Sequence, residues 1–320
     1  AKDDPAYEDM ASKFFEHFVA IADAMNNLGG SGLWDEEDGF YYDRLHVDTR
    51  EIPLRVRSLV GLVPLFAAEI LEDEAINRLP AFARRLRWFL ENRKDLARHI
   101  AYFEADGHGG HGHHLLAIPS KERLVRVLRY LLDETEFLAP GGIRSLSQFH
   151  REHPYVLHVN GEEHRVDYTP AESSTGLFGG NSNWRGPIWF PMNYLIVEAL
   201  ERYHHFYGDA LTVECPAGSG RFVTLQGAAQ EIASRLSRIF LPDAAGHRPC
   251  HGRDERFARD PHWKDLVLFH EYFCGDSGRG VGASHQTGWT ALAVRFLEDR
   301  ARAREGAERP RHATADAATA

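Results

Sequence analysis

The chain has 320 residues, enough for one large domain or two ordinary ones, and its net charge of −10 argues against a nucleic-acid partner, since phosphate contacts need a basic face. No apolar run approaches the roughly 20 residues of a membrane-spanning helix, so no membrane partner is predicted. Cys215, Cys250 and Cys274 are too widely spaced for a zinc or disulfide pattern, which favours a reducing, cytoplasmic location.

Helical periodicity dominates the chain. Helices are predicted at 6–26, 54–71, 79–93, 120–132, 187–207, 224–240 and 286–303. The stripe of the first helix consists of Phe14, Phe15, Phe18, Ile21 and Met25. Pro64 should kink the second helix, Ser120 should cap the fourth, and Pro187 should occupy the first turn of the fifth.

Strand signals are few. Residues 155–159 and 164–168 flank Asn160-Gly161, a dipeptide typical of two-residue hairpin turns. The run 266–269 is expected to be a short strand or a buried extended segment. Long aromatic-rich loops at 31–52, 138–186 and 241–285 separate the helices and are expected to carry function. The composition of 301–320 predicts a disordered tail.

The segment from Leu266 to Thr290, LVLFHEYFCGDSGRGVGASHQTGWT, is the most informative. An apolar run leads to Glu271, and glycines follow at 275, 278, 280 and 282, which permit close backbone approach. A carboxylate in this setting suits a sugar-cleaving site, although a single glutamate is also compatible with a solvated strand end.

Two further loops, 33–43 and 179–189, carry residue types that bind sugars through aromatic stacking and polar contacts. The candidate stacking platforms are Trp184, Trp189 and Trp289, and the candidate hydroxyl partners are Arg185, Asn181 and Asp43. Trp189 could simply pack, and Tyr42 and Asp43 could merely close a turn. Glu172 is a further candidate ligand contact, with no local feature that marks it as acid or base.

The tract from His108 to His114 holds four imidazoles within seven residues. No cysteine or carboxylate joins them at zinc-like spacing, and the intervening glycines favour a variable surface loop. We therefore expect no metal and no cofactor. A metal-dependent hydrolase or lyase using this tract is a distant alternative that a chelator would test.

Together, Trp34-Asp-Glu-Glu-Asp-Gly-Phe-Tyr-Tyr-Asp43, Asn183-Trp-Arg-Gly-Pro-Ile-Trp189, Glu271-Tyr with its glycine loop, and Thr287-Gly-Trp-Thr290 form a recognisable pattern. Over about 30–300 the chain resembles the C-terminal part of the catalytic domain of glycoside hydrolase family 63, the processing α-glucosidases and their bacterial relatives. The resemblance implies a mainly α fold, an (α/α)6 toroid, with inversion at the anomeric carbon and no cofactor.

On this resemblance Glu271 matches the general base, and Trp184, Arg185, Trp189, Tyr42 and Asp43 match sugar-pocket positions. Trp289 is added as a substrate-binding candidate from its own segment. The expected substrate is an α-linked glucoside or related oligosaccharide.

The family's general acid is an Asp in a glycine-containing motif upstream, and no such motif precedes Leu33. About seven of the toroid's twelve helices are predicted, so we expect residues 1–300 to be a partial catalytic domain that lacks its N-terminal half. Asp35 and Asp38 could replace the acid only from a segment expected to form a tight turn. The fragment alone should be inactive, and a non-catalytic carbohydrate-binding module is the alternative.

Overall fold

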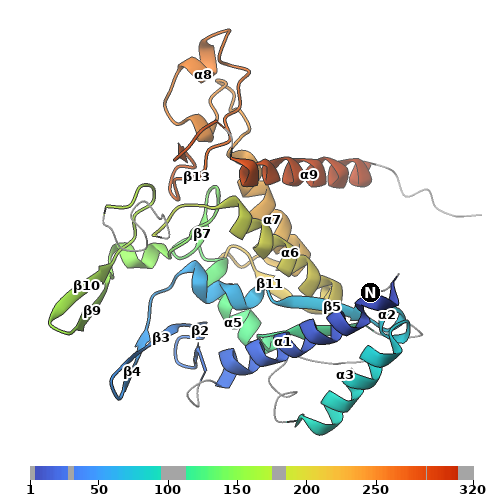
Figure 1. The fold of residues 1–320 in the computed structure, drawn as a ribbon. Helices are drawn as coiled ribbons and strands as arrows, with labels where there is room; N and C mark the ends of the chain where they lie inside the picture. The colour runs from blue at the N-terminus through green and yellow to red at the C-terminus, as the bar shows by residue number, and fades with distance from the viewer. Residues whose placement is uncertain (1–3, 28–31, 95–112, 175–184, 286, 309–320) are drawn as a thin grey trace, which may run out of the picture.

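The computed structural model describes residues 4–27, 32–94, 113–174, 185–285 and 287–308 (Figure 1). Its α-helices are α1 (Glu8–Asn27), α2 (Asp73–Asn77), α3 (Pro80–Asn92), α5 (Lys121–Leu131), α6 (Phe190–Tyr207), α7 (Leu225–Arg238), α8 (Arg256–Arg259) and α9 (Leu292–Glu308). Short 3-10 helices are η1 (Pro5–Tyr7), η3 (Leu59–Leu65), η4 (Gln148–Arg151), η5 (Gly208–Ala210), η6 (Pro249–His251) and η7 (Gly288–Ala291).

The described strands form seven separate two-stranded antiparallel sheets. The pairs are β1 (Trp34–Asp35) with β2 (Phe40–Tyr41), β3 (Asp43–Val47) with β4 (Arg50–Leu54), β5 (Ala68–Glu72) with β6 (His113–Ala117), β7 (Leu138–Ala139) with β8 (Gly142–Ile143), β9 (Tyr155–Val159) with β10 (Glu162–Val166), β11 (Thr212–Glu214) with β12 (Phe222–Thr224), and β13 (Tyr272–Phe273) with β14 (Gly280–Val281). The expected mainly helical fold is confirmed, and so is the expected hairpin at 155–168, but the other six strand pairs were not predicted.

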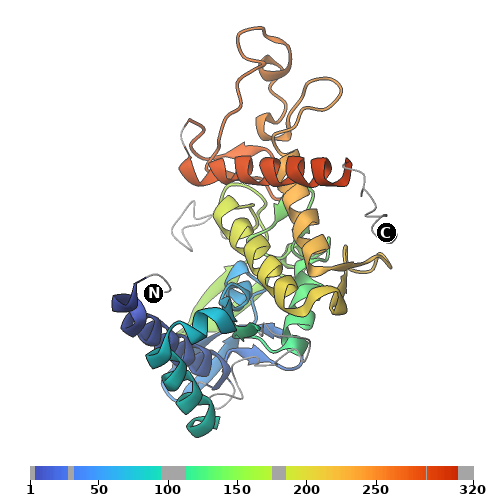
Figure 2. The same cartoon turned by 90° about the vertical axis from the view of Figure 1, so that its right-hand side faces the viewer.

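The main core lies where α5, α6, α7 and α9 meet the short hairpins. Helices α6 and α7 run alongside each other, and α9 crosses near their ends (Figures 1 and 2). Phe190 is fully buried there, with its ring edge-on to Phe240 at 5.6 Å and to Phe273 at 5.4 Å. These three phenylalanines hold the start of α6 against β13.

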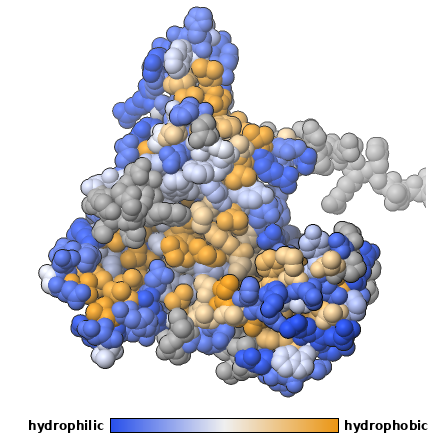
Figure 3. Space-filling model, viewed as in Figure 1, coloured by the Kyte–Doolittle hydropathy of each residue, from blue (hydrophilic) through white to orange (hydrophobic). Residues whose placement is uncertain are grey.

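A second, smaller core lies between α1 and α3, where Phe15 packs edge-on against Phe82 at 5.9 Å and Phe89 at 5.2 Å. The predicted stripe of α1 is only partly right. Phe15 is buried, but Phe14 is 66% exposed and Ile21 is 53% exposed. The buried stripe is instead Ser12, Phe15, Val19, Ala22 and Asn26. Apolar surface is visible over the α1–α3 region of the molecule (Figure 3).

The predicted helix at 54–71 is wrong. The segment ends β4, forms the 3-10 helix η3 with Pro64 inside it, and enters β5, whose partner β6 lies more than forty residues downstream. A run that is apolar on nearly every side has no helical periodicity to distinguish it from a buried turn-and-strand segment. Tertiary pairing decided its structure.

Several boundaries also differ. Helix α6 begins at Phe190 and carries Pro191, rather than Pro187, in its first turn. Helix α9 begins at Leu292 and continues to Glu308, so 301–308 extend a helix rather than the expected tail, while 309–320 lie outside the described residues. The run 266–269 forms no strand, and Leu266 and Val267 are exposed, which corrects the expected burial.

The predicted cap at Ser120 and the predicted turn at Asn160-Gly161 are confirmed. The Ser120 hydroxyl caps α5 by accepting from the Arg123 amide at 3.2 Å, and the Thr224 hydroxyl caps α7 by accepting from the Gly227 amide at 3.2 Å. Asn160 and Gly161 both have positive φ, as the β9–β10 turn requires. Cys215, Cys250 and Cys274 are buried free thiols. No helix in the described ranges is long and apolar enough to cross a membrane.

Candidate active site

The backbone before α6 forms a bridge to β13, and this bridge assembles the candidate site. Ile188 and Phe273 exchange two hydrogen bonds, with N–H to O=C distances of 2.8 and 3.0 Å. Both side chains are buried in the main core. Because neighbours along extended chains point to opposite faces, Trp189 and Tyr272 meet on the other side. Their rings stack with centroids 4.9 Å apart and planes inclined by 18°.

Glu271 directly precedes β13, and three hydrogen bonds hold it. Its amide donates to the Ala283 carbonyl at 2.8 Å, and its Oε2 accepts from the Ala283 amide at 3.3 Å. The Trp289 indole N–H donates to the Glu271 carbonyl at 2.8 Å. The backbone is thus anchored on both sides of the carboxylate-bearing residue.

Trp189, Tyr272 and Trp289 form an aromatic cluster beside Glu271. The rings of Trp189 and Trp289 lie 6.0 Å apart and are tilted by 49°. Trp289 remains 43% exposed, whereas Tyr272 is buried. Burial, followed by the negative charges of Glu172 and Glu271, raises the pKa of the Tyr272 phenol. Glu271 and an exposed indole thus lie beside the same pair of stacked rings.

Glycines allow the surrounding loops to touch through their backbones. A Cβ at Gly275 would lie 2.3 Å from the Gly186 carbonyl oxygen, and a Cβ at Gly282 would lie 2.6 Å from Glu271 Oε2. The close approach expected of the glycine loop is therefore present. It brings the loop after β13 directly against the loop before α6.

Arg185, predicted as a sugar contact, is fully buried and forms an ion pair with Asp167 at 3.6 Å. Its carbonyl accepts from the Thr169 amide at 2.7 Å. This geometry gives Arg185 a role in holding the loop before α6. Trp184 and Asn181 lie outside the described residues.

Tyr42 and Asp43 lie apart from Glu271. Tyr42 lies between β2 and β3, Asp43 begins β3, and both strands are separated from β13 in Figure 1. The buried Tyr42 hydroxyl donates to Asp38 Oδ2 at 2.8 Å, and Asp43 is exposed at the start of β3. In the described structure these two residues belong to the β1–β4 region rather than to the aromatic cluster.

Asp35 closes the turn expected of its segment. Its Oδ1 accepts from the Glu37 and Asp38 amides, both at 3.0 Å, and Arg55 pairs with it at 3.0 Å. Although burial works in the opposite direction, the hydrogen bonds and Arg55 lower the pKa of Asp35. A lowered pKa is unfavourable for a proton donor, so Asp35 is poorly suited to be the general acid.

Sequence reasoning did not find a network that supports the loop after β13. The buried Tyr168 hydroxyl accepts from Arg144 Nε at 3.1 Å and donates to Asp276 Oδ1 at 2.8 Å. Arg151 also pairs with Asp276 at 2.5 Å. These residues come from distant segments without a common motif, so no local signal could have found them.

The structure describes only the end of the histidine tract. His113 and His114 belong to β6 rather than to a loop, and His114 Nε2 lies 2.8 Å from Asp73 Oδ1. The earlier part of the tract lies outside the described residues. Within the part of the chain that the structure describes, no group of three or more His, Cys, Asp or Glu side chains could hold a metal ion.

Comparison with known proteins identifies the family of the chain. A family model described as the mannosylglycerate hydrolase MGH1-like glycoside hydrolase domain matches residues 113–290. The chain belongs to this glycoside hydrolase family, and the resemblance to glycoside hydrolase family 63 is thereby confirmed. Its mainly helical fold with small hairpins is consistent with an (α/α) toroid-type architecture.

Among curated proteins, the uncharacterized Saccharomyces cerevisiae protein YMR196W is 48% identical over 315 residues, covering 93% of this chain and 29% of the relative. The probable mannosyl-oligosaccharide glucosidase of Schizosaccharomyces pombe is 24% identical, with coverages of 55% and 15%. The mannosyl-oligosaccharide glucosidase of S. cerevisiae is 26% identical, with coverages of 38% and 11%. The chain thus spans less than a third of the length of these relatives.

Among solved structures, a mannosylglycerate hydrolase of family 63 from Thermus thermophilus, in complex with glucose, is 16% identical with a TM-score of 0.30. That match covers 83% of this chain and 36% of the other.

Proposed function

We propose that this chain supplies the general base and part of the sugar pocket of an inverting glycoside hydrolase that acts on α-linked glucosides or related oligosaccharides. The observation that carries the proposal is the position of Glu271, which is anchored through its backbone beside an exposed indole and a stacked Trp–Tyr pair. Aromatic faces suit the C–H faces of a sugar, and a carboxylate suits activation of water.

In the proposed reaction the Glu271 carboxylate takes a proton from water as the water oxygen attacks the anomeric carbon. The bond between that carbon and the glycosidic oxygen breaks, and a carboxylic acid on the opposite face protonates the departing oxygen. Inverting enzymes place these two groups roughly 6.5–9.5 Å apart to accommodate the water. We propose that the acid comes from a part of the enzyme outside these residues, since Asp35 is committed to its turn.

Trp289 and Trp189 are proposed to contact the sugar, with Trp184 completing the pocket. Arg185 is proposed to position the loop that carries Trp184 and Trp189. Tyr42 and Asp43 remain proposed pocket residues from the resemblance alone. The three buried thiols support a cytoplasmic location.

The first prediction concerns Glu271→Gln in a longer protein that includes this chain. The amide keeps the shape of the side chain but cannot accept the proton from water, so kcat/KM should fall by about 10³-fold or more with the fold retained. The rate of hydrolysis of α-glucosides and α-mannosides measures the change in kcat/KM. The anomeric configuration of the product shows whether the reaction inverts.

Glu172→Gln is the matched control, because the charge of Glu172 also raises the pKa of Tyr272 but Glu172 is not assigned the base; it should cost less than about tenfold. Near-normal turnover by Glu271→Gln would refute the assignment. Saturable sugar binding without turnover in the unmodified longer protein would favour a carbohydrate-binding module instead. The 320-residue chain alone should show no turnover.

A further inference from the structure

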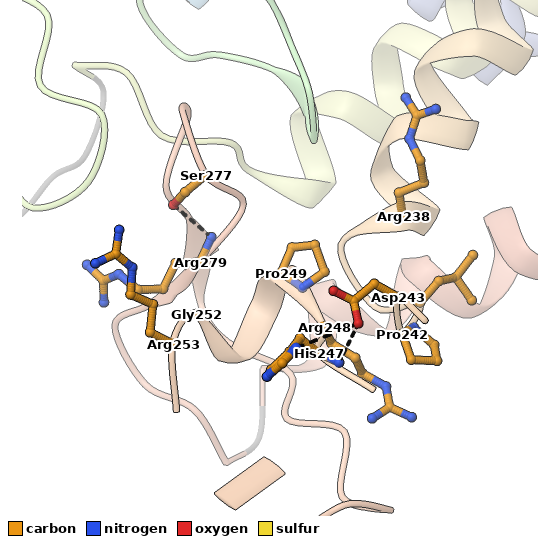
Figure 4. Close-up of a pocket in the computed structure, with 11 residues that line it drawn as sticks. Arg238, Pro242, Asp243, His247, Arg248, Pro249, Gly252, Arg253, Ser277 and Arg279 are labelled. Carbon is orange, nitrogen blue, oxygen red and sulfur yellow. Dashed lines mark hydrogen bonds and ion pairs between the residues drawn. The ribbon is translucent and has the colours of Figure 1, made fainter. Parts of the chain in front are cut away.

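A basic pocket lies between the end of α7 and the loop that joins β13 to β14 (Figure 4). Its volume is about 840 Å³, and its lining includes the four arginines Arg238, Arg248, Arg253 and Arg279. Neither Glu271 nor the aromatic cluster beside it lines this pocket. Four arginines around one concavity are notable in a chain with a net charge of −10.

Arg253 and Arg279 come together on one side of the pocket. A Cβ at Gly252 would lie 2.9 Å from Arg279 Cδ, so the stem of Arg279 packs directly over the backbone that leads into Arg253. Figure 4 shows the two side chains extending on the same side, whereas Arg238 and Arg248 lead away from them. Arg248 also donates to the Phe240 and Lys264 carbonyls, both at 3.1 Å.

Neighbouring carboxylates do not neutralise this pair. Asp254 is held by Arg256, with an Nε–Oδ1 distance of 3.0 Å, and Asp276 is held by Arg151 and Tyr168.

Asp243, the carboxylate in the pocket wall, accepts from the Ala245 and His247 amides of its own turn at 2.8 and 2.9 Å. Within the described ranges, Arg253 and Arg279 form no ion pair with a carboxylate. Two adjacent guanidinium groups therefore keep a positive field that an anion would neutralise.

The remaining lining indicates what kind of anion fits. Ser277 Oγ accepts from the Arg279 amide at 3.3 Å, which leaves the hydroxyl proton free to be donated. Leu241, Pro242 and Pro249 form an apolar wall that suits the carbon skeleton of a ligand. Guanidinium groups bind phosphate through paired, charge-assisted hydrogen bonds. The concavity and the negative net charge favour a small molecule over a nucleic acid.

We propose that Arg253, Arg279 and Ser277 bind the phosphate group of a small organic phosphate, such as a sugar phosphate. The carbon skeleton of this ligand lies against the apolar wall. Glu271 does not line this pocket, and the proposal does not depend on the proposed hydrolase activity.

The second prediction is tested by calorimetric titration of the 320-residue chain with inorganic phosphate and with glucose 6-phosphate, at ionic strength held constant with sodium chloride. Binding should be saturable with one site per chain. Arg253→Ala and Arg279→Ala should each weaken it about tenfold or more, because each removes a charged donor. Glucose, which lacks the phosphate, should not compete.

Arg84→Ala is the matched control, since Arg84 is an exposed arginine of α3 away from the pocket, and it should leave the affinity unchanged. Tighter binding of glucose 6-phosphate than of phosphate would support a role for the apolar wall, and equal binding would assign the site to free phosphate. Absence of saturable binding, or an equal loss in Arg84→Ala, would overturn the proposal.

Discussion

At the scale of single residues, the Glu271 position depends on contacts with residues well beyond its own Glu271-Tyr motif. Trp289, eighteen residues later, holds its carbonyl, and Ala283 holds both its amide and one carboxylate oxygen. The residue types were readable from the sequence, but Trp289 was expected only to stack on a ligand. Its indole N–H shows that the same side chain also orients the backbone at Glu271.

His251, the last residue of the 3-10 helix η6, provides a pH-dependent test of the structure around it. The ring is buried and stacks on Phe257 at 4.1 Å, and neither ring nitrogen forms a hydrogen bond within the described part of the chain. Burial, followed by the charges of Arg248 and His270, lowers the pKa of His251 to about 4, while Asp254 acts in the opposite direction.

The third prediction follows from the sign of this shift. The unfolded state binds the proton near pH 6.5 and the folded state only near pH 4, so the contribution is fully present above pH 6.5 and is lost as the pH falls. Between pH 7.5 and 4 the free energy of unfolding of the wild type should fall because His251 takes up a proton on unfolding. In His251→Gln this fall should be smaller by up to about 3 kcal/mol. Urea unfolding across that pH range measures it.

His150 and His270 have pKa values lowered in the same direction and titrate in both proteins, so the difference between variant and wild type reports His251 and its interaction with His270. His17→Gln, at an exposed position of α1, should leave the pH dependence unchanged. Parallel pH profiles for wild type and His251→Gln would contradict this prediction.

At the scale of elements, the β13–β14 hairpin is a short pairing that carries a large part of the candidate site. Only Tyr272–Val281 and Phe273–Gly280 pair in it, yet it joins the main core through Ile188 and the aromatic cluster through Tyr272. The glycines of this hairpin were singled out from the sequence, but no hairpin was predicted there, since two-residue strands have no periodicity.

The fourth prediction concerns Gly282→Ala. Gly282 has φ of +71°, and a Cβ would meet Glu271 Oε2, so alanine should both strain the backbone and displace the carboxylate. Gly161→Ala, in the β9–β10 turn, has φ of +78° and open space around it. It should therefore show the backbone cost alone, about 1–2 kcal/mol.

Gly282→Ala should lower the free energy of unfolding by more than Gly161→Ala does, and it should also reduce hydrolysis in the longer protein, which Gly161→Ala should not. Urea denaturation and activity measurements separate the two effects. Equal losses of stability, with activity retained in both variants, would show that the contact with Glu271 is unimportant.

At the scale of the whole molecule, the paired helices α1 and α3 form a small core of their own with apolar side chains left outside it. Phe14 and Ile21 lie seven residues apart, on one side of α1, and Trp88 of α3 is 58% exposed. Between the helices a groove of about 620 Å³ is lined by Phe15, Val19, Trp88 and Phe89 among others. Exposed apolar surface of this kind favours association.

The fifth prediction is that the 320-residue chain self-associates as its concentration rises. Replacing Phe14, Ile21 and Trp88 together by glutamine should shift it towards the monomer, because these changes keep helix-compatible residues while removing apolar area. Sedimentation velocity measures the distribution. Phe222→Gln, an equally exposed aromatic on β12, is the control. A monomer at every concentration would contradict the prediction.

The sequence by itself determined the features that depend on residues within a few positions of each other. The cap at Ser120, the Asn160-Gly161 turn and the ordered motifs around Glu271 are of this kind, because turn and cap energies are local. Only the tertiary structure decided that 59–65 forms a 3-10 helix and that Arg185 is buried against Asp167. The bridge between Ile188 and Phe273, which places Trp189 beside Tyr272, also depends on pairing between distant segments. Local patterns carry no information about such pairing.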